Sequence, residues 1–259
     1  MDAELACIDG ELVPLAQATI AVTDQGLIRG DGAFEVIRLY GGRAYALDAH
    51  LARLERSAAG LRLPLDLAAV RADIDALLAT RAHGDELVRV MATRGGRRIT
   101  LIEPLPAVPA TFALVPITYA PPRLLDGIKS LSYAANMLAS RLAREQGGDE
   151  ALLISPHGRV LECPTASFFL VRGAETWTAP LSDHVLDSIT RRAVLAVCTV
   201  REEPISTDLL RDGAEAFLAS SVIEVAGVRS VAERRYAAPG PRTRDVARLV
   251  RERILAELR

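Results

Sequence analysis

The sequence predicts an α/β fold of the α+β type, built from two lobes with mostly antiparallel sheets. Strand-like alternation and helix-like spacing of apolar residues both recur along the chain. Short glycine turns such as Gly41-Gly42 separate strand segments, which favours hairpins and therefore antiparallel pairing. Two adjacent prolines lie in 118–127, where they fit neither a helix nor a central strand. We therefore expect a smaller N-terminal α/β domain over 1–117, a linker over 118–127, and a larger C-terminal domain over 128–259 with a mostly antiparallel sheet or barrel.

Strands and two helices are expected in the N-terminal part. Residues 33–40 alternate between apolar and polar like a strand, and they end at the turn Gly41-Gly42. Asp48 is the expected N-cap of the first helix, in which apolar residues recur every three or four positions until Pro64. The other elements expected here are a hairpin of 4–8 and 11–13, a helix over 66–82 closed by Gly84, and strands over 86–93 and 111–117.

The C-terminal part shows the same mixture of patterns. Gly147-Gly148 ends a helix over about 133–146. The turn Pro156-His157-Gly158 joins strands over 150–155 and 159–163. The remaining elements expected here are strands over 167–172, 215–220 and 222–231, a helix over 190–199 and a final amphipathic helix over 243–258.

The composition is that of an ordinary globular protein and argues against several classes. Half of the 259 residues are hydrophobic, a quarter are charged, and the formal net charge is −2. This balance does not suggest a surface for nucleic acid or an anionic membrane. No apolar run approaches the roughly 18–20 residues that span a bilayer, and the first residues lack the features of a secretory signal. We expect a cytoplasmic protein in a reducing setting.

Metal and disulfide chemistry are not indicated by the sequence. The three cysteines are odd in number and far apart, and the four histidines form no H-x-x-x-H pair. Because the chain also lacks a C-x-x-C pair, we expect neither a metal site nor a disulfide framework.

The most informative residue is Lys129, because it is the only lysine among 31 lysines and arginines. A chain that uses arginine for all its other positive side chains has little general need for lysine. Arginine stays protonated, whereas the ε-amine of lysine can lose its proton and attack a carbonyl. The pattern favours a Schiff base with a carbonyl substrate or with pyridoxal phosphate, and the simpler alternative is a chance surface lysine.

Three further sites accompany this lysine. Glu162 ends a strand that leaves a hairpin, Ser188-Ile189-Thr190 begins a helix, and Arg53 lies on the first amphipathic helix. A helix N-terminus binds anions such as phosphate through its unpaired backbone amides. Each site also has a simpler explanation, because Thr190 could be an ordinary N-cap, and Glu162 and Arg53 could be solvated surface charges.

Four segments, taken in order, form a pattern over nearly the whole chain. They are Gly30-Asp31-Gly32-Ala33-Phe34-Glu35-Val36, His50-Leu51-Ala52-Arg53-Leu54 with Ser57-Ala58, Asp149-Glu150-Ala151-Leu152-Leu153, and Ser220-Ser221 with Glu224-Val225. Each segment alone is a weak signal, whereas their order and spacing together are specific. The pattern resembles the fold-type IV pyridoxal-phosphate enzymes, the class IV aminotransferases. This family includes D-amino acid transaminases, branched-chain aminotransferases, (R)-selective amine transaminases and aminodeoxychorismate lyases.

The resemblance implies pyridoxal 5'-phosphate as the cofactor and a role for each site. Lys129 would form the Schiff base and carry the proton to and from the substrate. Glu162 would pair with the pyridine nitrogen and keep it protonated, so that the ring acts as an electron sink. Tyr133 would contact the phenolic side of the cofactor. The phosphate ligands that the resemblance implies are Arg53, Ile189, Thr190 and Ser221.

The strand over 33–40 bears on which member of the family the chain resembles. Its alternation should point Phe34, Val36 and Arg38 into the site. Aminodeoxychorismate lyases tend to have a threonine at the place of Val36, where its hydroxyl can help to protonate the leaving pyruvate. Valine cannot transfer a proton, and D-amino acid transaminases carry it. Branched-chain enzymes fit less well, because they usually have glycine at this place and Gly-Ser where this chain has Cys163-Pro164.

Three arginines are candidates for binding the substrate carboxylate. The loop that begins Thr93-Arg94-Gly95 resembles a segment of D-amino acid transaminases and lyases in which an arginine a few residues further on binds that carboxylate. Arg97 or Arg98 would do so here, and Arg38 is a second possibility. The histidine that accompanies this arginine in D-amino acid transaminases is absent. Both loop arginines could instead be solvent-facing charges.

The expected activity is a ping-pong transaminase reaction from a D-amino acid, with a small (R)-amine as a further donor class, to a 2-oxo acid. The alternative is an aminodeoxychorismate lyase that releases pyruvate to give 4-aminobenzoate, and the segment 129–137 resembles chains that carry this name. A non-catalytic binding module is a third reading, against which Lys129 and Glu162 together argue. The resemblance also implies a homodimer with active sites near the interface, small-molecule substrates, and no nucleic-acid or membrane partner.

Overall fold

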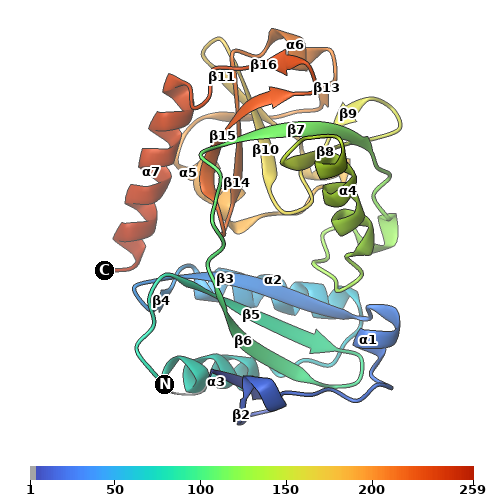
Figure 1. The fold of residues 1–259 in the computed structure, drawn as a ribbon, viewed down its shortest axis with the longest axis vertical. Helices are drawn as coiled ribbons and strands as arrows, with labels where there is room; N and C mark the ends of the chain where they lie inside the picture. The colour runs from blue at the N-terminus through green and yellow to red at the C-terminus, as the bar shows by residue number, and fades with distance from the viewer. Residues whose placement is uncertain (1–3) are drawn as a thin grey trace. The chain divides into compact units, whose positions relative to one another are not determined.

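A computed structural model describes residues 4–259 and divides the chain into two compact units (Figure 1). The first unit is formed by residues 4–106 together with 128–133, and the second by 107–127 and 134–257. Both units combine a β-sheet with helices, as the mixed α/β expectation requires. Among the described residues, no helix is long and apolar enough to cross a membrane.

The division differs from the expected boundary at 117. Strand β7 (Thr111–Thr118) pairs with β8 (Glu150–Ile154) and β15 (Glu224–Val231), so it belongs to the sheet of the second unit. Residues 128–133 come after the expected linker but return to the first unit. Both differences arise from long-range strand pairing, which local sequence patterns do not report.

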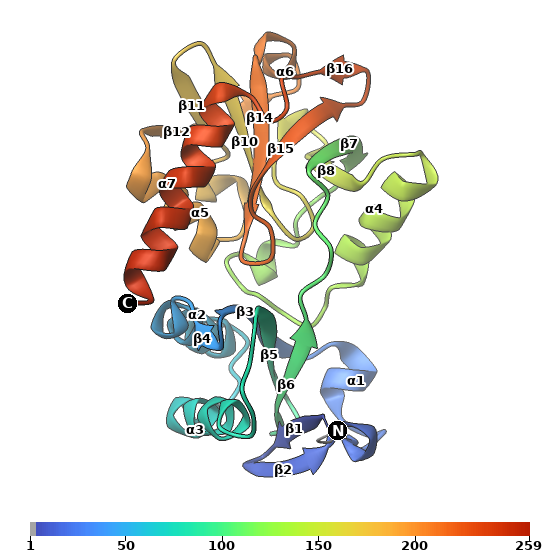
Figure 2. The same cartoon turned by 60° about the vertical axis from the view of Figure 1, so that its left-hand side comes forward.

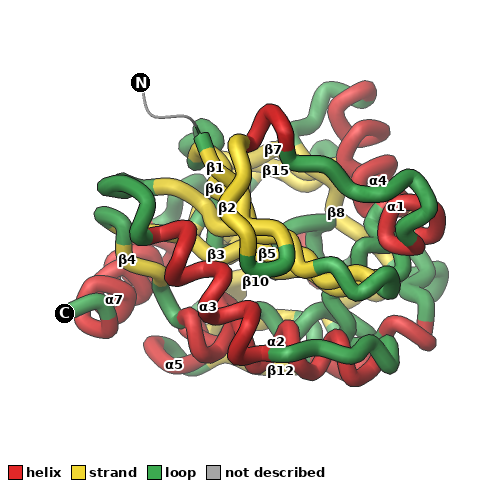
Figure 3. The backbone as a smooth tube through the Cα atoms, turned by 90° about the horizontal axis from the view of Figure 1, so that it is seen from below, coloured by secondary structure: helices red, strands yellow, loops and turns green. Residues whose placement is uncertain are grey.

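The first unit contains a six-stranded sheet in the order β2-β1-β6-β5-β3-β4, in which every pairing is antiparallel. Two helices, α2 and α3, cover one face of this sheet (Figures 2 and 3). The strands are β1 (Leu5–Ile8), β2 (Glu11–Pro14), β3 (Gly32–Tyr40), β4 (Arg43–Ala44), β5 (Glu86–Thr93) and β6 (Arg98–Pro104). The helices are the 3-10 turn Leu15–Gln17, α1 (Gln25–Arg29), α2 (Leu47–Gly60) and α3 (Leu67–Leu78).

The core of the first unit lies between this sheet face and the two helices. Ile37 and Leu39 of β3 pack with Leu54 of α2 and Ile74 of α3, and all four side chains are fully buried. Val90 of β5 completes the same cluster. Burial of such aliphatic side chains stabilises a fold by about 1.5–3 kcal/mol each. The opposite sheet face is therefore the one available for function.

The predicted N-cap of α2 is wrong, whereas α3 is capped by the side chain of Asp66. Helix α2 begins at Leu47 after Ala46, so Asp48 is not its N-cap; it lies in the first turn and forms an exposed ion pair with Arg71. In α3, the side chain of Asp66 accepts a hydrogen bond of 3.0 Å from the N–H of Ala69. This helix ends at Leu78, earlier than the expected residue 82.

The second unit contains a ten-stranded sheet in the order β12-β11-β10-β14-β15-β7-β8-β9-β13, with β16 paired to β15. Helices α5 and α7 pack together against β14 and β15, whereas α4 packs on β7 and β8 (Figures 1 and 2). The remaining strands are β9 (Arg159–Val160), β10 (Ser167–Arg172), β11 (Glu175–Thr178), β12 (Val200–Glu202), β13 (Ile205–Ser206), β14 (Glu215–Ser220) and β16 (Arg234–Arg235). The helices are α4 (Ala134–Glu145), α5 (Ile189–Val197), α6 (Leu209–Asp212) and α7 (Pro241–Glu257), with 3-10 turns at Arg123–Leu125 and Leu181–Asp183.

Antiparallel pairing predominates in this sheet, with three parallel pairings that the sequence did not predict. Strand β7 runs parallel to both of its neighbours, and β11 runs parallel to β12. A parallel neighbour requires a crossover connection, which α4 supplies between β7 and β8. The expected strand over 159–163 is shorter, because β9 ends at Val160.

A buried polar network joins β3 to α2 inside the first unit. The carboxylate of Glu35 accepts hydrogen bonds from Arg53 Nε at 2.6 Å and Arg53 Nη2 at 2.8 Å, and its Oε2 lies 2.8 Å from His50 Nδ1. Glu35 and His50 are fully buried. Burial acts to raise the pKa of Glu35, but the hydrogen bond and charge of Arg53, with a smaller effect of His50, lower that pKa to about 2. Desolvation lowers the pKa of His50, so a neutral ring donates from Nδ1 to the ionised carboxylate.

Replacing Glu35 with glutamine should destabilise the protein, because it leaves the Arg53 cation buried without its carboxylate. We expect a loss of about 3 kcal/mol in unfolding free energy, measured by urea denaturation at pH 7. The folded pKa of Glu35 is depressed, so its stabilisation is present above pH 4.5 and is lost as the pH falls from there to about 2. The Glu35→Gln variant should lack that component of the acid sensitivity.

The matched control is Asp48→Asn, which removes the exposed ion pair with Arg71. Exposed pairs contribute little, so we expect a change below about 1 kcal/mol. Equal losses in the two variants would contradict the view that the Glu35 network is a stabilising element of the first unit.

Candidate functional site

Lys129 lies on a segment that extends the first sheet at the edge of β3. The N–H of Phe34 donates to the carbonyl of Lys129 at 3.0 Å, and the N–H of Leu131 donates to the carbonyl of Gly32 at 2.8 Å. Gly32 makes this approach possible, because a Cβ there would lie 2.5 Å from the carbonyl oxygen of Ala92 and from the side chain of Leu131. The lysine backbone is therefore fixed by the first unit.

The ammonium group of Lys129 lies against two aromatic rings. Its Nζ is 4.2 Å from the ring centroid of Phe34 and 5.6 Å from that of Tyr133. The two rings meet edge to face, with centroids 5.4 Å apart and an interplanar angle of 81°. The backbone N–H of Lys129 donates to Ser57 Oγ of α2 at 3.1 Å. The two adjoining rings limit the positions of the amine, as a reactive group requires.

The structure confirms that Phe34, Val36 and Arg38 share one face of β3. Glu35 and Ile37 between them face the helices and are fully buried, whereas Val36 and Arg38 are half-buried. The guanidinium of Arg38 lies 4.7 Å from the ring centroid of Tyr40. The three residues thus lie on the same face as the contacts of Lys129, and their role in substrate binding stays a prediction.

The predicted phosphate ligand Arg53 lies on the opposite side of β3. Its Nε and Nη2 atoms bind Glu35, and the residue is 5 % exposed. This contact gives Arg53 a structural task that the sequence reasoning missed. The sequence did contain a signal for this contact, because Glu35 is a charged residue at a core position of an alternating strand. Such a group needs a buried partner. Whether Arg53 also binds phosphate stays a prediction.

Arg97 and Arg98 are both paired with carboxylates inside the first unit. Arg97 Nη1 lies 2.7 Å from Asp9 Oδ2, and Arg98 Nε donates to Asp73 Oδ2 of α3 at 2.9 Å. Arg98 pairs with Ala92, which puts its side chain on the helix-covered face of the sheet. Both guanidinium groups have a carboxylate partner within the chain, and a role of either arginine in binding the substrate carboxylate stays a prediction.

In the second unit, Glu162 is held in a fixed orientation. Its carbonyl accepts a hydrogen bond of 2.9 Å from the N–H of Leu153, and its Oε1 accepts one of 3.0 Å from the N–H of Leu186. The pKa of Tyr119 is raised, first by burial and then by the charge of Glu162. A half-buried carboxylate fixed in this way can accept a hydrogen bond from a protonated ring nitrogen.

The N-terminus of α5 is the expected phosphate site, and this role stays a prediction. Ser188, not Thr190, is the N-cap, and its Oγ accepts a hydrogen bond of 3.3 Å from the N–H of Arg191. The amides of Ile189 and Thr190 precede the first intrahelical hydrogen bond, and both residues are buried. Such amides, with the Thr190 hydroxyl, are suited to bind a phosphate. Ser221, which directly follows β14, is half-buried, and its role as a phosphate ligand stays a prediction.

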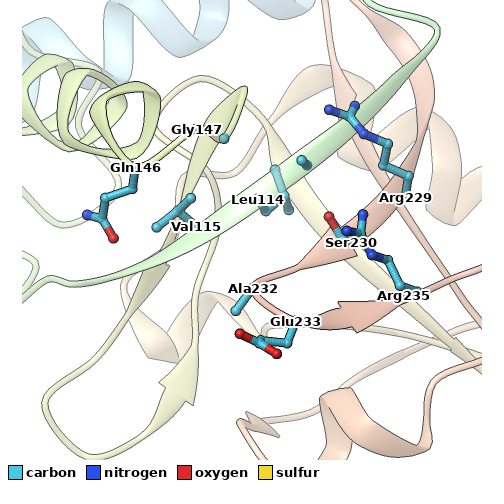
Figure 4. A pocket seen from close by; sticks show the side chains of 11 residues that line it. Leu114, Val115, Gln146, Gly147, Arg229, Ser230, Ala232, Glu233 and Arg235 are labelled. Carbon is cyan, nitrogen blue, oxygen red and sulfur yellow. The ribbon is translucent and has the colours of Figure 1, made fainter.

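A separate cavity of about 700 Å³ lies in the second unit, between the end of α4 and strands β7, β15 and β16 (Figure 4). Arg229, on its wall, is 2.7 Å from Asp149. None of the predicted site residues lines this cavity. It is therefore distinct from the two groups of predicted residues described above.

Comparison with known proteins identifies the family of this chain. The sequence profile of amino-transferase class IV matches residues 32–231. A D-alanine aminotransferase from Bacillus licheniformis is 30 % identical over 96 % of both chains, and a putative branched-chain-amino-acid aminotransferase from Methanocaldococcus jannaschii is 30 % identical over 85 % of both.

Solved structures show the same relationship. A hypothetical aminotransferase from Mycobacterium tuberculosis in its PLP-bound form has a TM-score of 0.89 at 26 % identity, covering 98 % of this chain and 99 % of that one. The fold IV transaminase CpuTA1 from Curtobacterium pusillum has a TM-score of 0.82 at 28 % identity, covering 93 % of each chain. The family match covers far more than half of the sequence, and the expected fold class is confirmed. The chain therefore belongs to the class IV aminotransferases, fold-type IV enzymes that use pyridoxal 5'-phosphate to move an amino group from an amino donor to a 2-oxo acid.

Proposed function

We propose that this aminotransferase takes D-amino acids as donors, with small (R)-amines as a further donor class. The observation that carries the proposal is the amine of Lys129, the only lysine, which lies against the rings of Phe34 and Tyr133. The similarity to D-alanine aminotransferase over 96 % of both chains supports the donor class. Val36 supports a transaminase over aminodeoxychorismate lyase, because a valine side chain has no proton to give.

The described residues fit the three reactive parts of pyridoxal phosphate. Lys129 is a carbonyl-reactive amine, Glu162 is a fixed carboxylate for a ring N–H, and the first amides of α5 suit a phosphate. When bound, the cofactor supplies an electron sink for charge that develops at the substrate α-carbon.

Each residue then has one task in the proposed mechanism. Lys129 Nζ would hold the cofactor covalently and would move the proton at the substrate α-carbon. Glu162 keeps a proton on the ring nitrogen through a charge-assisted hydrogen bond. Tyr133 contacts the phenolic side. The phosphate ligands are Arg53, Ile189, Thr190 and Ser221.

A half-reaction tests the donor class directly. The protein loaded with pyridoxal phosphate should lose its visible absorption band on addition of D-alanine and release about one pyruvate per site, since ping-pong chemistry stops without an acceptor. Adding 2-oxoglutarate should restore the band. L-leucine and L-valine serve as comparators, and we expect them to react at least about tenfold more slowly.

The outcomes separate the remaining readings. Faster reaction with the L-amino acids would contradict the D-amino acid proposal and favour a branched-chain enzyme. This alternative is supported by relatives named as branched-chain-amino-acid aminotransferases. A band that persists with every donor, combined with turnover of aminodeoxychorismate, would instead establish the lyase. A protein that takes up no cofactor would favour a binding module.

Replacing Lys129 with arginine tests the covalent role, because it keeps the positive charge but removes the only side-chain amine. We expect the visible band to disappear and turnover to fall by at least about 10³-fold. The exposed Arg43→Ala serves as the control and should keep both signals. A Lys129→Arg variant with a normal band and normal turnover would refute the assignment.

The family resemblance also leads us to propose a homodimer with active sites near the interface. Size-exclusion chromatography with light scattering should give a mass near twice the 27.8 kDa of one chain. An active monomer would contradict this proposal.

A further inference from the structure

Arg89 lies on the same sheet face as the Lys129 contacts, although its sequence context does not mark it. Residue Arg89 of β5 is directly opposite Val36 of β3, and directly opposed side chains lie on one face of a sheet. Its guanidinium carbon is 5.8 Å from the ring centroid of Phe34, and Lys129 Nζ is 4.2 Å from the same centroid. The two cations are therefore no more than 10 Å apart.

Glu103 of β6 holds this arginine along one edge. Arg89 Nε donates to Oε1 and Nη2 donates to Oε2, both at 2.8 Å. A guanidinium has five N–H donors in a fixed plane, so this forked contact leaves the two N–H groups of Nη1 and one of Nη2. No other hydrogen bond of Arg89 occurs among residues 4–259. The side chains of Arg89 and Glu103 are 31 % and 29 % exposed, so a small molecule can reach them.

The other arginines considered for the substrate carboxylate lack this combination. Arg97 and Arg98 are bound to Asp9 and Asp73, and Arg98 lies on the helix-covered face. Arg38 shares the face with Val36, but it is two residues further from Phe34 along β3. Arg89 lies on the same sheet face as Phe34, and its guanidinium is close to the Phe34 ring that Lys129 also contacts. It also has N–H donors that do not bind Glu103.

We propose that Arg89 binds the carboxylate of the amino donor and of the 2-oxo acid through its Nη1 edge, and that Glu103 is the positioning residue that presents this edge. The inference rests on the proposed function, in which Lys129 is the reacting amine. In an amino acid the carboxylate carbon is two bonds from the nitrogen. An arginine near the reacting amine can therefore bind the carboxylate and leave the amino group free to react. The substrate class is thus amino acids and 2-oxo acids in preference to amines without a carboxylate.

The test measures binding as well as turnover. Neither pyruvate nor the pyridoxal form of the enzyme carries an amino group to transfer. Pyruvate can therefore occupy this form without transamination, and isothermal titration gives its dissociation constant. In Arg89→Leu we expect that constant and the KM for D-alanine to rise on the order of 30-fold, because a forked charge-assisted contact is lost. The rate of the half-reaction with an (R)-amine, which has no carboxylate, should stay within about twofold.

Two further variants separate recognition from folding. Arg89→Lys keeps the charge without the fork and should show a rise on the order of tenfold even if Arg89→Leu folds poorly. Glu103→Gln should raise the KM for D-alanine on the order of fivefold with kcat unchanged, because Arg89 loses its fixed orientation. The matched control is Arg81→Leu, which removes an arginine bound to Glu86 at 2.6 Å elsewhere in the first unit. It should change neither constant.

Pyruvate affinity and a D-alanine KM within threefold of the wild type in both Arg89 variants would overturn the proposal. Equal losses with D-alanine and the (R)-amine, with the visible band intact, would overturn it too, because recognition would then not concern the carboxylate. Failure of the proposed function shows elsewhere, as wild-type protein that does not react with D-alanine. Pyruvate binding still decides the role of Arg89 in that case.

Discussion

The carboxylate of Glu35 holds the side chains of Arg53 and His50 inside the first unit and thereby fixes α2 against β3. A charged group at such a depth is unfavourable unless it is paired, so the contact allows little variation in how strand and helix meet. Phe34 comes directly before this residue, so it faces the other way. The position of the aromatic ring next to Lys129 therefore depends on a polar contact on the far side of the strand.

Helix α2 also reaches Lys129 directly through Ser57. The same helix that binds Glu35 accepts the backbone N–H of the lysine at 3.1 Å, and β3 pairs with the lysine segment on its edge. Strand, helix and segment thus form a closed set of contacts around one backbone position. A shift of β3 by one residue would exchange the positions of Phe34 and Glu35 and break every one of these contacts.

Local patterns in the sequence were sufficient to predict the bounds of elements that have one buried face. The alternation of 33–40 and the strands over 86–93, 167–172 and 215–220 were all predicted close to their observed bounds, because core packing enforces the period. The predicted fold class and cofactor are confirmed by the family match. Strand β6 was missed, since Arg98–Pro104 follows a glycine loop and is recognisable only through its pairing with β5 and β1.

The arginines show a limit of a different kind. Sequence motifs indicated Arg97 and Arg98, but the residues that decide their orientation, Asp9 and Asp73, lie far away in the chain. In the same way, the proposed role of Arg89 depends on its contacts with Glu103 and with Phe34, which lie on neighbouring strands. Strand register decides which face of the sheet a charged side chain lies on, and its ion-pair partners decide which of its hydrogen-bond donors remain for a ligand.

The charge balance on the Phe34 face explains why Glu103 is compatible with anion binding. Two unit charges 10 Å apart repel by about 1.7 kcal/mol at an effective dielectric constant of about 20, so Lys129 and Arg89 would disfavour each other without a counter-ion. Glu103 offsets this repulsion when no substrate is bound, and its forked contact uses only one edge of the guanidinium. A substrate carboxylate would then bind to the other edge without displacing Glu103. The pair stays partly exposed, so water screens the repulsion between the two carboxylates, whereas a fully buried pair would disfavour a second anion strongly.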